Sequence, residues 1–278
     1  MLAEVPMKST FALIFLSFVF LGCQSNKTEV TYVPQVISAN TDFNFHPKET
    51  DTKLSLVKYT PPANAPTNEV KKETFGVKFG DTTVHIQLDK RDPESAHKEF
   101  SFAKFINTQQ TAMLVQIADR SGLVAPFFII AAKDGQLQVH QLYRASNGKL
   151  DKDITRGVKA VGSSGYLVNN DYFVTNVNAK VYLIKRQNSN ERIQGDFFIQ
   201  SSNRQTLVFL VPSAFYQVHY PTGENFTQAL PASLPMVNAA IYKWVQATCS
   251  WVKNAQDISF LKSFPGDNRI RNLSEFKD

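Results

Sequence analysis

The sequence predicts a mainly β protein, an antiparallel β-sandwich with a C-terminal amphipathic helix. The 278 residues include 22 Phe and 9 Tyr, residue types that favour strands. Short segments in which apolar and polar residues alternate recur between turn sequences, as in a sheet with one buried face. After about residue 237, the apolar residues recur with helical spacing instead.

The composition is that of a globular protein with one sizeable core, since 43% of the residues are hydrophobic and 19% are charged. The patterns described below divide the chain into four regions. They are a signal peptide (1–22), a flexible tether (23–72), the β-sandwich (73–222) and a helical C-terminal segment packed on the sandwich (223–278).

The N-terminus is typical of an export signal, because Lys8 precedes an apolar run from Phe11 to Leu21. A membrane-spanning anchor is the alternative, but about 11 apolar residues are half of the roughly 20 that a transmembrane helix needs. Met7 is a better start than Met1, because Glu4 opposes the positive end of such a signal. Both starts stay open.

The end of the apolar run, Phe20-Leu21-Gly22-Cys23, resembles the lipobox of bacterial lipoproteins, which usually has Leu where Phe20 stands. The resemblance implies that Cys23 is acylated, for example with palmitate, and that the membrane is a partner through this lipid. Two or more acyl chains anchor a protein stably. By resemblance to the sorting rule of enteric lipoproteins, Gln24 implies the periplasmic face of the outer membrane, with the inner membrane as the alternative.

The next region, residues 23–72, is polar and contains a proline cluster from Pro61 to Pro66, which favours extended backbone. A tether of this length can hold a folded domain well away from the bilayer. Val30 to Ile37 is the one stretch in it that is expected to pair as an edge strand.

Strand patterns begin at Glu73, and Val84, Ile86 and Leu88 alternate with polar residues. The nearly continuous apolar run from Ala125 to Ala132 predicts a strand covered on both faces. Asp134-Gly135 follows it and predicts a hairpin. Later strands are expected at 166–168, 172–174, 181–184, 197–200 and 206–211. The sequence shows no internal repeat.

The C-terminal segment has apolar residues near one face of a helix, at Val237, Ile241, Trp244, Val245, Thr248, Trp251 and Val252. Trp244 and Trp251 are the candidate ligand-binding residues, because two indole rings on one face could stack on a sugar. The alternative is that both anchor the helix on the sandwich core.

No catalytic motif is found, so the sequence predicts no catalytic residues, no cofactor and no enzyme activity. A hydrolase whose site follows no known motif stays open. Once lipid occupies Cys23, Cys249 is the remaining thiol and no intramolecular disulfide can form. We expect Cys249 to be a buried, inert thiol and not a nucleophile, because its neighbours supply no base.

The five histidines predict no metal site, because none lies at ligand spacing from another His or Cys. Two of them, His85 and His140, are expected on solvent-exposed strand faces. The acids Asp151, Asp153 and Asp171 are expected in loops as hydrophilic turn residues.

The formal charge of +6 is scattered in short pairs such as Lys71-Lys72 and Lys185-Arg186. Because no basic stripe with interleaved aromatic residues is present, no nucleic-acid partner is predicted.

Three segments together resemble the maltose operon periplasmic protein family: residues 32–35 (Tyr-Val-Pro-Gln), the Ala-Pro that opens the strand at 125–135, and the strand 205–211. The resemblance implies a periplasmic protein without established catalytic residues, encoded with maltodextrin uptake genes. The sequence and this resemblance together predict a lipid-anchored accessory protein that binds maltodextrin-type carbohydrate in support of its uptake. The alternative is a structural lipoprotein that docks on an envelope protein complex or on peptidoglycan.

Overall fold

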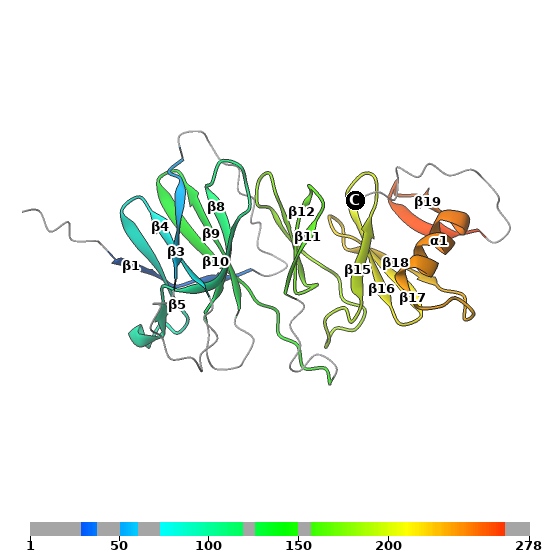
Figure 1. The fold of residues 1–278 in the computed structure, drawn as a ribbon, viewed down its shortest axis with the longest axis horizontal. Helices are drawn as coiled ribbons and strands as arrows, with labels where there is room; N and C mark the ends of the chain where they lie inside the picture. Colours follow the sequence, from blue (N-terminus) through cyan, green and yellow to red (C-terminus); the bar gives the residue numbers. More distant parts are fainter. Residues whose placement is uncertain (1–28, 38–50, 61–72, 119–125, 150–156, 265–278) are drawn as a thin grey trace, which may run out of the picture.

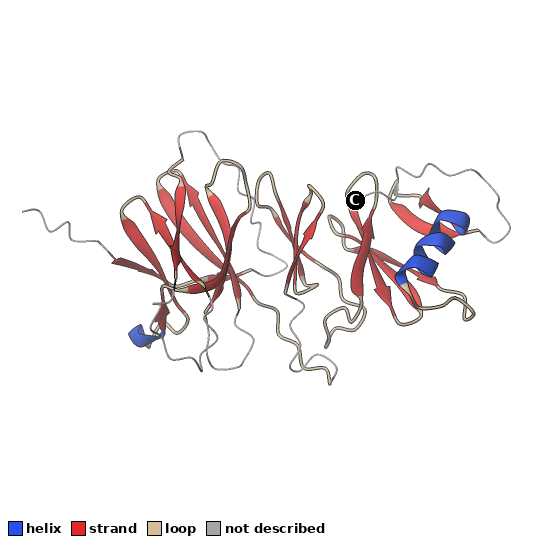
Figure 2. Cartoon of the chain, viewed as in Figure 1, coloured by secondary structure: helices blue, strands red, loops and turns tan. Residues whose placement is uncertain are grey.

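The computed structural model describes residues 29–37, 51–60, 73–118, 126–149 and 157–264. Within these ranges the chain is mainly β, with several antiparallel sheets and one C-terminal α-helix, so the predicted fold class is confirmed (Figures 1 and 2). The sheets follow one another along the longest axis of the molecule. Strand β1 lies at one end of this axis and helix α1 at the other (Figure 1).

The first sheet has ten strands that wrap around a core of their own. A short 3-10 helix, Pro93–Ser95, lies between β5 and β6. The strands are β1 (Glu29–Tyr32), β2 (Gln35–Val36), β3 (Leu54–Tyr59), β4 (Thr74–Phe79), β5 (Thr82–Gln87), β6 (Ala96–His97), β7 (Phe100–Phe105), β8 (Ala112–Ile117), β9 (Phe127–Lys133) and β10 (Gln136–Leu142).

The N-terminal segment connects the two edges of this sheet. Strand β1 pairs in parallel with β5 at one edge, and β2 pairs in parallel with β10 at the other. Only Val33 and Pro34 separate β1 from β2. Ile37, which follows β2, is fully buried, and its N–H donates to the Gln141 carbonyl at 3.1 Å.

The expected boundary at residue 73 therefore differs from the structure, which places β1, β2 and β3 inside the region expected to be a tether. Strand β3 pairs along its whole length with β4, and its Leu54 is buried in the first core. An argument from composition misses the extent of these strands, because what holds them is backbone pairing with strands that are distant in the sequence. The described part of the chain begins at Glu29, with β1.

The predicted hairpin at Asp134-Gly135 is confirmed between β9 and β10. Both residues have positive φ, 50° and 76°, as a two-residue turn of type I′ requires. The Asp134 N–H donates to the Asp51 carboxylate at 2.8 Å, which fixes the start of β3 to this turn.

Two further sheets follow, each of four antiparallel strands in up-and-down order. The strands of the second sheet are β11 (Val158–Val161), β12 (Gly165–Val168), β13 (Tyr172–Thr175) and β14 (Val181–Leu183). Those of the third are β15 (Asp196–Gln200), β16 (Thr206–Val211), β17 (Ala214–His219) and β18 (Glu224–Ala229). The sheet arrangement thus continues past residue 222, where the sandwich was expected to end.

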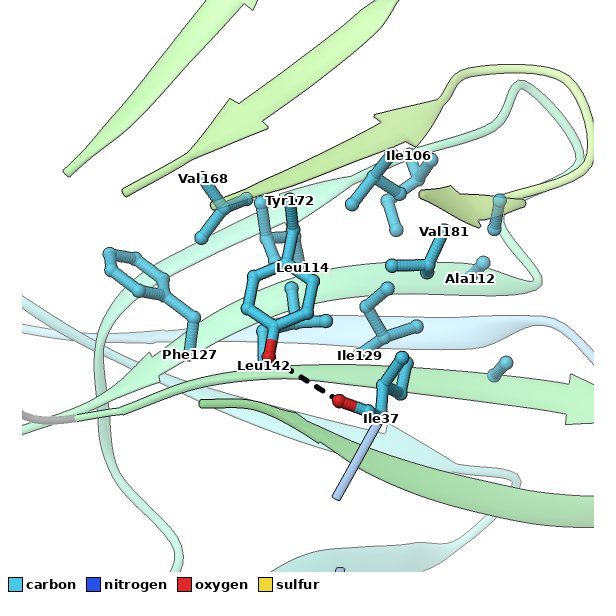
Figure 3. Close-up of a cluster of buried hydrophobic side chains, with 13 residues drawn as sticks. Ile37, Ile106, Ala112, Leu114, Phe127, Ile129, Leu142, Val168, Tyr172 and Val181 are labelled. Atoms are coloured by element: carbon cyan, nitrogen blue, oxygen red, sulfur yellow. Dashed lines mark hydrogen bonds between the residues drawn. The ribbon is translucent and has the colours of Figure 1, made fainter. Parts of the chain in front are cut away.

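Alternate residues of the second sheet are buried in two different cores. On β13, Tyr172 and Val174 pack against β8 and β9 of the first sheet, whereas Phe173 packs against β16 and β17 of the third. Figure 3 shows the first of these cores, in which the Tyr172 hydroxyl donates to the Ile37 carbonyl at 3.4 Å. Because successive side chains of a strand point to opposite faces, the second sheet is a layer that is apolar on both faces.

The outer face of the third sheet is covered by helix α1 (Asn238–Thr248) and by a hairpin of β19 (Cys249–Lys253) and β20 (Ser259–Ser263). Ile241 and Val245 of the helix are buried there against aromatic residues of the sheet. The prediction that Trp251 and Val252 continue the helix is wrong, because both lie in β19. The whole of β19 pairs with β20, and this pairing buries Leu261. These contacts stabilise the strand more than the helical spacing of the side chains favours a helix.

Strand β20 crosses the third sheet and is held there by side chains. Gln217 of β17 is fully buried, and its amide bonds both backbone groups of Leu261, donating to the carbonyl and accepting from the N–H, each at 2.7 Å. On either side, the Thr206 hydroxyl donates to the Ser259 carbonyl at 2.8 Å, and Gln228 accepts from the Ser263 N–H at 3.0 Å. We call these three side chains the glutamine clasp.

Candidate functional site

An open cavity of about 350 Å³ lies beside helix α1, at the end of the molecule opposite β1. Three elements build it: the chain after β18, the helix, and the end of β20. Its lining residues are Ala229, Leu230, Pro231, Trp244, Thr248 and Ser263. The volume is at the lower end of the range for small-molecule sites.

The Trp244 indole forms part of the wall of this cavity. Its ring is half-buried and packs on Phe215, with the ring centroids 6.3 Å apart. Packing on a fully buried ring holds the indole in place, so that its orientation is set before any ligand arrives. Trp244 is thus the one sequence-predicted ligand residue that the structure places at a cavity.

Besides the Trp244 indole, the polar side chains among the lining residues are two hydroxyls. The Thr248 hydroxyl donates to the Trp244 carbonyl at 2.8 Å, so it offers a lone pair to a ligand and not a proton. Ser263 supplies the second hydroxyl. A ring with one apolar face and hydroxyl groups on its rim matches this lining.

Trp251 does not belong to the cavity. It lies on β19, partly buried against the core beneath α1, and it is not among the lining residues. Its indole Nε1 is buried without a hydrogen-bond partner among the described residues. The two tryptophans therefore do not form a single stacking platform for a sugar, and both pack against the core beneath α1, as the alternative for them expects.

A buried charge cluster, which sequence reasoning missed, centres on Asp171. This carboxylate was expected to serve as an exposed turn residue, but it is 1% exposed and binds Arg186 through two hydrogen bonds of 2.8 and 2.9 Å. Arg192 donates to it at 3.1 Å, and Arg144 lies 3.9 Å away. Burial and the neighbouring Arg186 lower the pKa of Arg144.

The cluster joins three parts of the chain. Arg144 follows the first sheet, Asp171 lies at the turn between β12 and β13, and Arg186 begins the connection from the second sheet to the third. Arg186 also donates to the carbonyls of Ala145 and Ser189 at 2.9 and 3.1 Å. These bonds join the connection between the first and second sheets to the connection between the second and third sheets. We therefore interpret the cluster as structural. The sequence signal was an Asp directly before the apolar strand 172–174.

The expected exposure of the two strand histidines is wrong. His140 of β10 is 8% exposed, and burial lowers its pKa. His85 of β5 is largely covered by β1, with its Nε2 3.8 Å from the Glu29 carboxylate. The strands that pair beside the two histidines, β1 and β2, lie in the region that was expected to be a tether. The alternation of apolar and polar residues within β5 and β10 could therefore not reveal that these histidines are buried.

Other expected sites have these outcomes. Cys249 is fully buried, and it forms no disulfide among the described residues. Cys23, Asp151 and Asp153 lie outside the described residues. In the part of the chain that the structure describes, no group of His, Cys, Asp and Glu could hold a metal ion, and no helix is long and apolar enough to cross a membrane.

Comparisons with known proteins identify no relative of this chain. The chain matches no protein-family model, and no curated protein or solved structure is significantly similar to it.

Proposed function

We propose that the protein is a lipid-anchored periplasmic accessory protein of the outer membrane, held by lipid on Cys23, and that it binds maltodextrin-type carbohydrate at the cavity beside Trp244. The observation that carries the ligand site is a pre-positioned indole in the wall of an open cavity with two hydroxyls. The C–H face of a glucose unit stacks on such a ring, and its hydroxyls bond to Thr248 and Ser263.

Two features of the chain support a binding role over a catalytic one. Among the described residues that line the cavity, none has a carboxylate, imidazole or amine side chain, so none of them supplies a general acid or base to a bound ligand. The export signal and the lipobox resemblance support a location in the periplasm, where oligosaccharides pass during uptake.

Thermal unfolding against linear maltodextrins tests this proposal. The chain from residue 24 onward includes every described residue and is the protein to use. A ligand that binds only the folded state raises the midpoint by an amount that grows with its concentration. A saturable rise with one glucan and not with its isomers is expected, and Trp244→Ala should abolish it.

Trp251→Phe is the matched control, because it removes an indole from the same core without touching the cavity. It should leave the ligand-dependent rise intact even if the midpoint itself falls. An equal loss of the rise in both variants would contradict a site at Trp244, and no rise with any glucan would contradict carbohydrate binding.

The alternative function is docking on an envelope protein complex or on peptidoglycan, and one observation favours a protein partner. Three large apolar side chains flank α1 and the cavity: Met236, Val237 and Phe264 are 50%, 59% and 39% exposed. Exposed apolar residues beside a cavity are typical of protein interfaces. Capture of an envelope partner that is lost with Met236→Ser and Val237→Ser, without any response to glucans, would support this alternative.

A further inference from the structure

We infer that the lipid on Cys23 holds the β1 end of the molecule against the bilayer, with the start of β1 and the β4–β5 turn facing the phospholipid surface. This inference rests on the proposed anchor at Cys23. It concerns the surface of the protein that meets the membrane, and it replaces the long tether that the sequence predicts.

The argument begins with the length of chain between the lipid and the first strand. Only residues 24–28 separate Cys23 from Glu29, the first residue of β1. Even fully extended, six residue steps span about 20 Å, whereas a linker from Cys23 to residue 73 could span about 165 Å. A folded β1 therefore shortens the reach of the anchor about eightfold.

Strand β1 can serve as a fixed attachment point for the lipid anchor, because it is paired along its whole length. Its four residues are in register with Thr83 to Ile86 of β5, and Tyr32 packs on the first core. The segment then continues through β2 to the buried Ile37, so both edges of the sheet hold it. The lipid thus connects to a fixed part of the fold.

The register also identifies the surface that lies nearest to the anchor. Glu29 pairs with Thr83, the second residue of β5, and β5 follows the turn Gly80-Asp81 at the end of β4. The start of β3 is adjacent, because Leu54 pairs with Phe79. Helix α1, whose Trp244 lines the cavity, lies at the other end of the long axis (Figure 1).

The charges on this surface do not favour attachment without lipid. Glu29 and Asp81 are balanced by Lys53 and Lys78, so the surface has no basic excess that would attract anionic headgroups. We therefore expect the covalent linkage alone to orient the molecule.

Energy transfer in reconstituted vesicles tests the orientation. The full lipidated chain with Cys249→Ala is labelled at Asp81→Cys or at Ala255→Cys, two exposed positions at opposite ends. The vesicles contain phosphatidylethanolamine, phosphatidylglycerol and an acceptor on a lipid headgroup. The label at position 81 should transfer several-fold more strongly than the label at 255, and twenty Gly-Ser residues inserted after Thr28 should lower the signal at 81.

Each other outcome has one meaning. Weak transfer from both positions would mean a long tether and would overturn the inference. Strong transfer from both would mean that the molecule lies flat, which would also overturn it. If instead the wild-type chain does not float with vesicles and behaves like Cys23→Ala, the proposed anchor has failed, and this result is separate from the orientation. The chain from residue 24 should not float.

Discussion

The two ends of the stack of sheets are closed by different kinds of contact. At the β1 end, the N-terminal segment adds backbone hydrogen bonds to both edges of the first sheet through β1 and β2. At the α1 end, the glutamine clasp holds β20 across the face of the third sheet with side chains. Backbone pairing tolerates many side chains, whereas a clasp depends on three particular ones. The two ends should therefore differ in their sensitivity to single substitutions.

The Asp171 cluster lies between the two ends, and its loss should affect the stability of both. Asp171→Asn leaves Arg186 buried with no full counter-charge, which should cost about 3–5 kcal/mol. This is the largest effect that we expect from one substitution. Urea unfolding gives the free energy, and the exposed Asp196→Asn is the control, expected to change it by less than about 0.5 kcal/mol.

If the cluster couples the two ends, the loss in Asp171→Asn will appear in one transition, seen alike by tryptophan fluorescence near α1 and by far-ultraviolet circular dichroism of the sheets. Two separated transitions in the wild type would instead mean that the ends unfold independently.

At the β1 end, Ile37→Ala should destabilise the protein by about 2–4 kcal/mol, because a fully buried side chain is lost between the first and second sheets. Val36→Ala is the matched control, since this neighbour is 52% exposed and should cost well under 1 kcal/mol. Chemical denaturation measures both. Equal, small effects would mean that residues 29–37 form a tether after all.

At the α1 end, Gln217→Leu should cost about 2–3 kcal/mol, because it leaves both backbone groups of Leu261 buried without partners. The exposed Gln256→Leu is the control. Protection of the Leu261 amide in native-state hydrogen exchange should fall with Gln217→Leu. Unchanged protection would show that the apolar contacts under α1, and not the clasp, hold the hairpin.

The same contrast explains what could be predicted from the sequence. Strands β12 to β16 of the second and third sheets and the Asp134-Gly135 hairpin were predictable, because their apolar periodicity and turn residues are local, whereas β11, β17 and β18 were not predicted. The expected edge strand at Val30 to Ile37 is confirmed by β1 and β2, but β3 was assigned to the tether, since backbone pairing with distant strands leaves little trace in side-chain pattern. Asp171 and Arg186 are 15 residues apart, and Gln217 and Leu261 are 44 apart, so no local signal links them.

For the candidate site, helical spacing correctly placed Trp244 on α1 but wrongly extended the helix to Trp251. A period of 3.6 over seven residues cannot exclude a strand that starts at Cys249. Only the pairing of β19 with β20, which joins residues up to 14 positions apart, decides this. The cavity itself depends on three chain segments that meet only in the folded protein.

The smallest predicted effect concerns acid and His140, at the β1 end. Burial lowers the pKa of His140 in the folded protein below its ordinary value of 6.5, so the unfolded chain binds the proton more strongly. Stability should therefore be constant above about pH 6.5 and should fall as the pH drops below it, toward the folded pKa. His219, at the α1 end, shifts in the same direction, mainly through burial. His140→Gln should reduce the slope of unfolding free energy against pH between 6.5 and 5 without removing it, because His219 still titrates. An unchanged slope would assign this acid sensitivity to the α1 end alone.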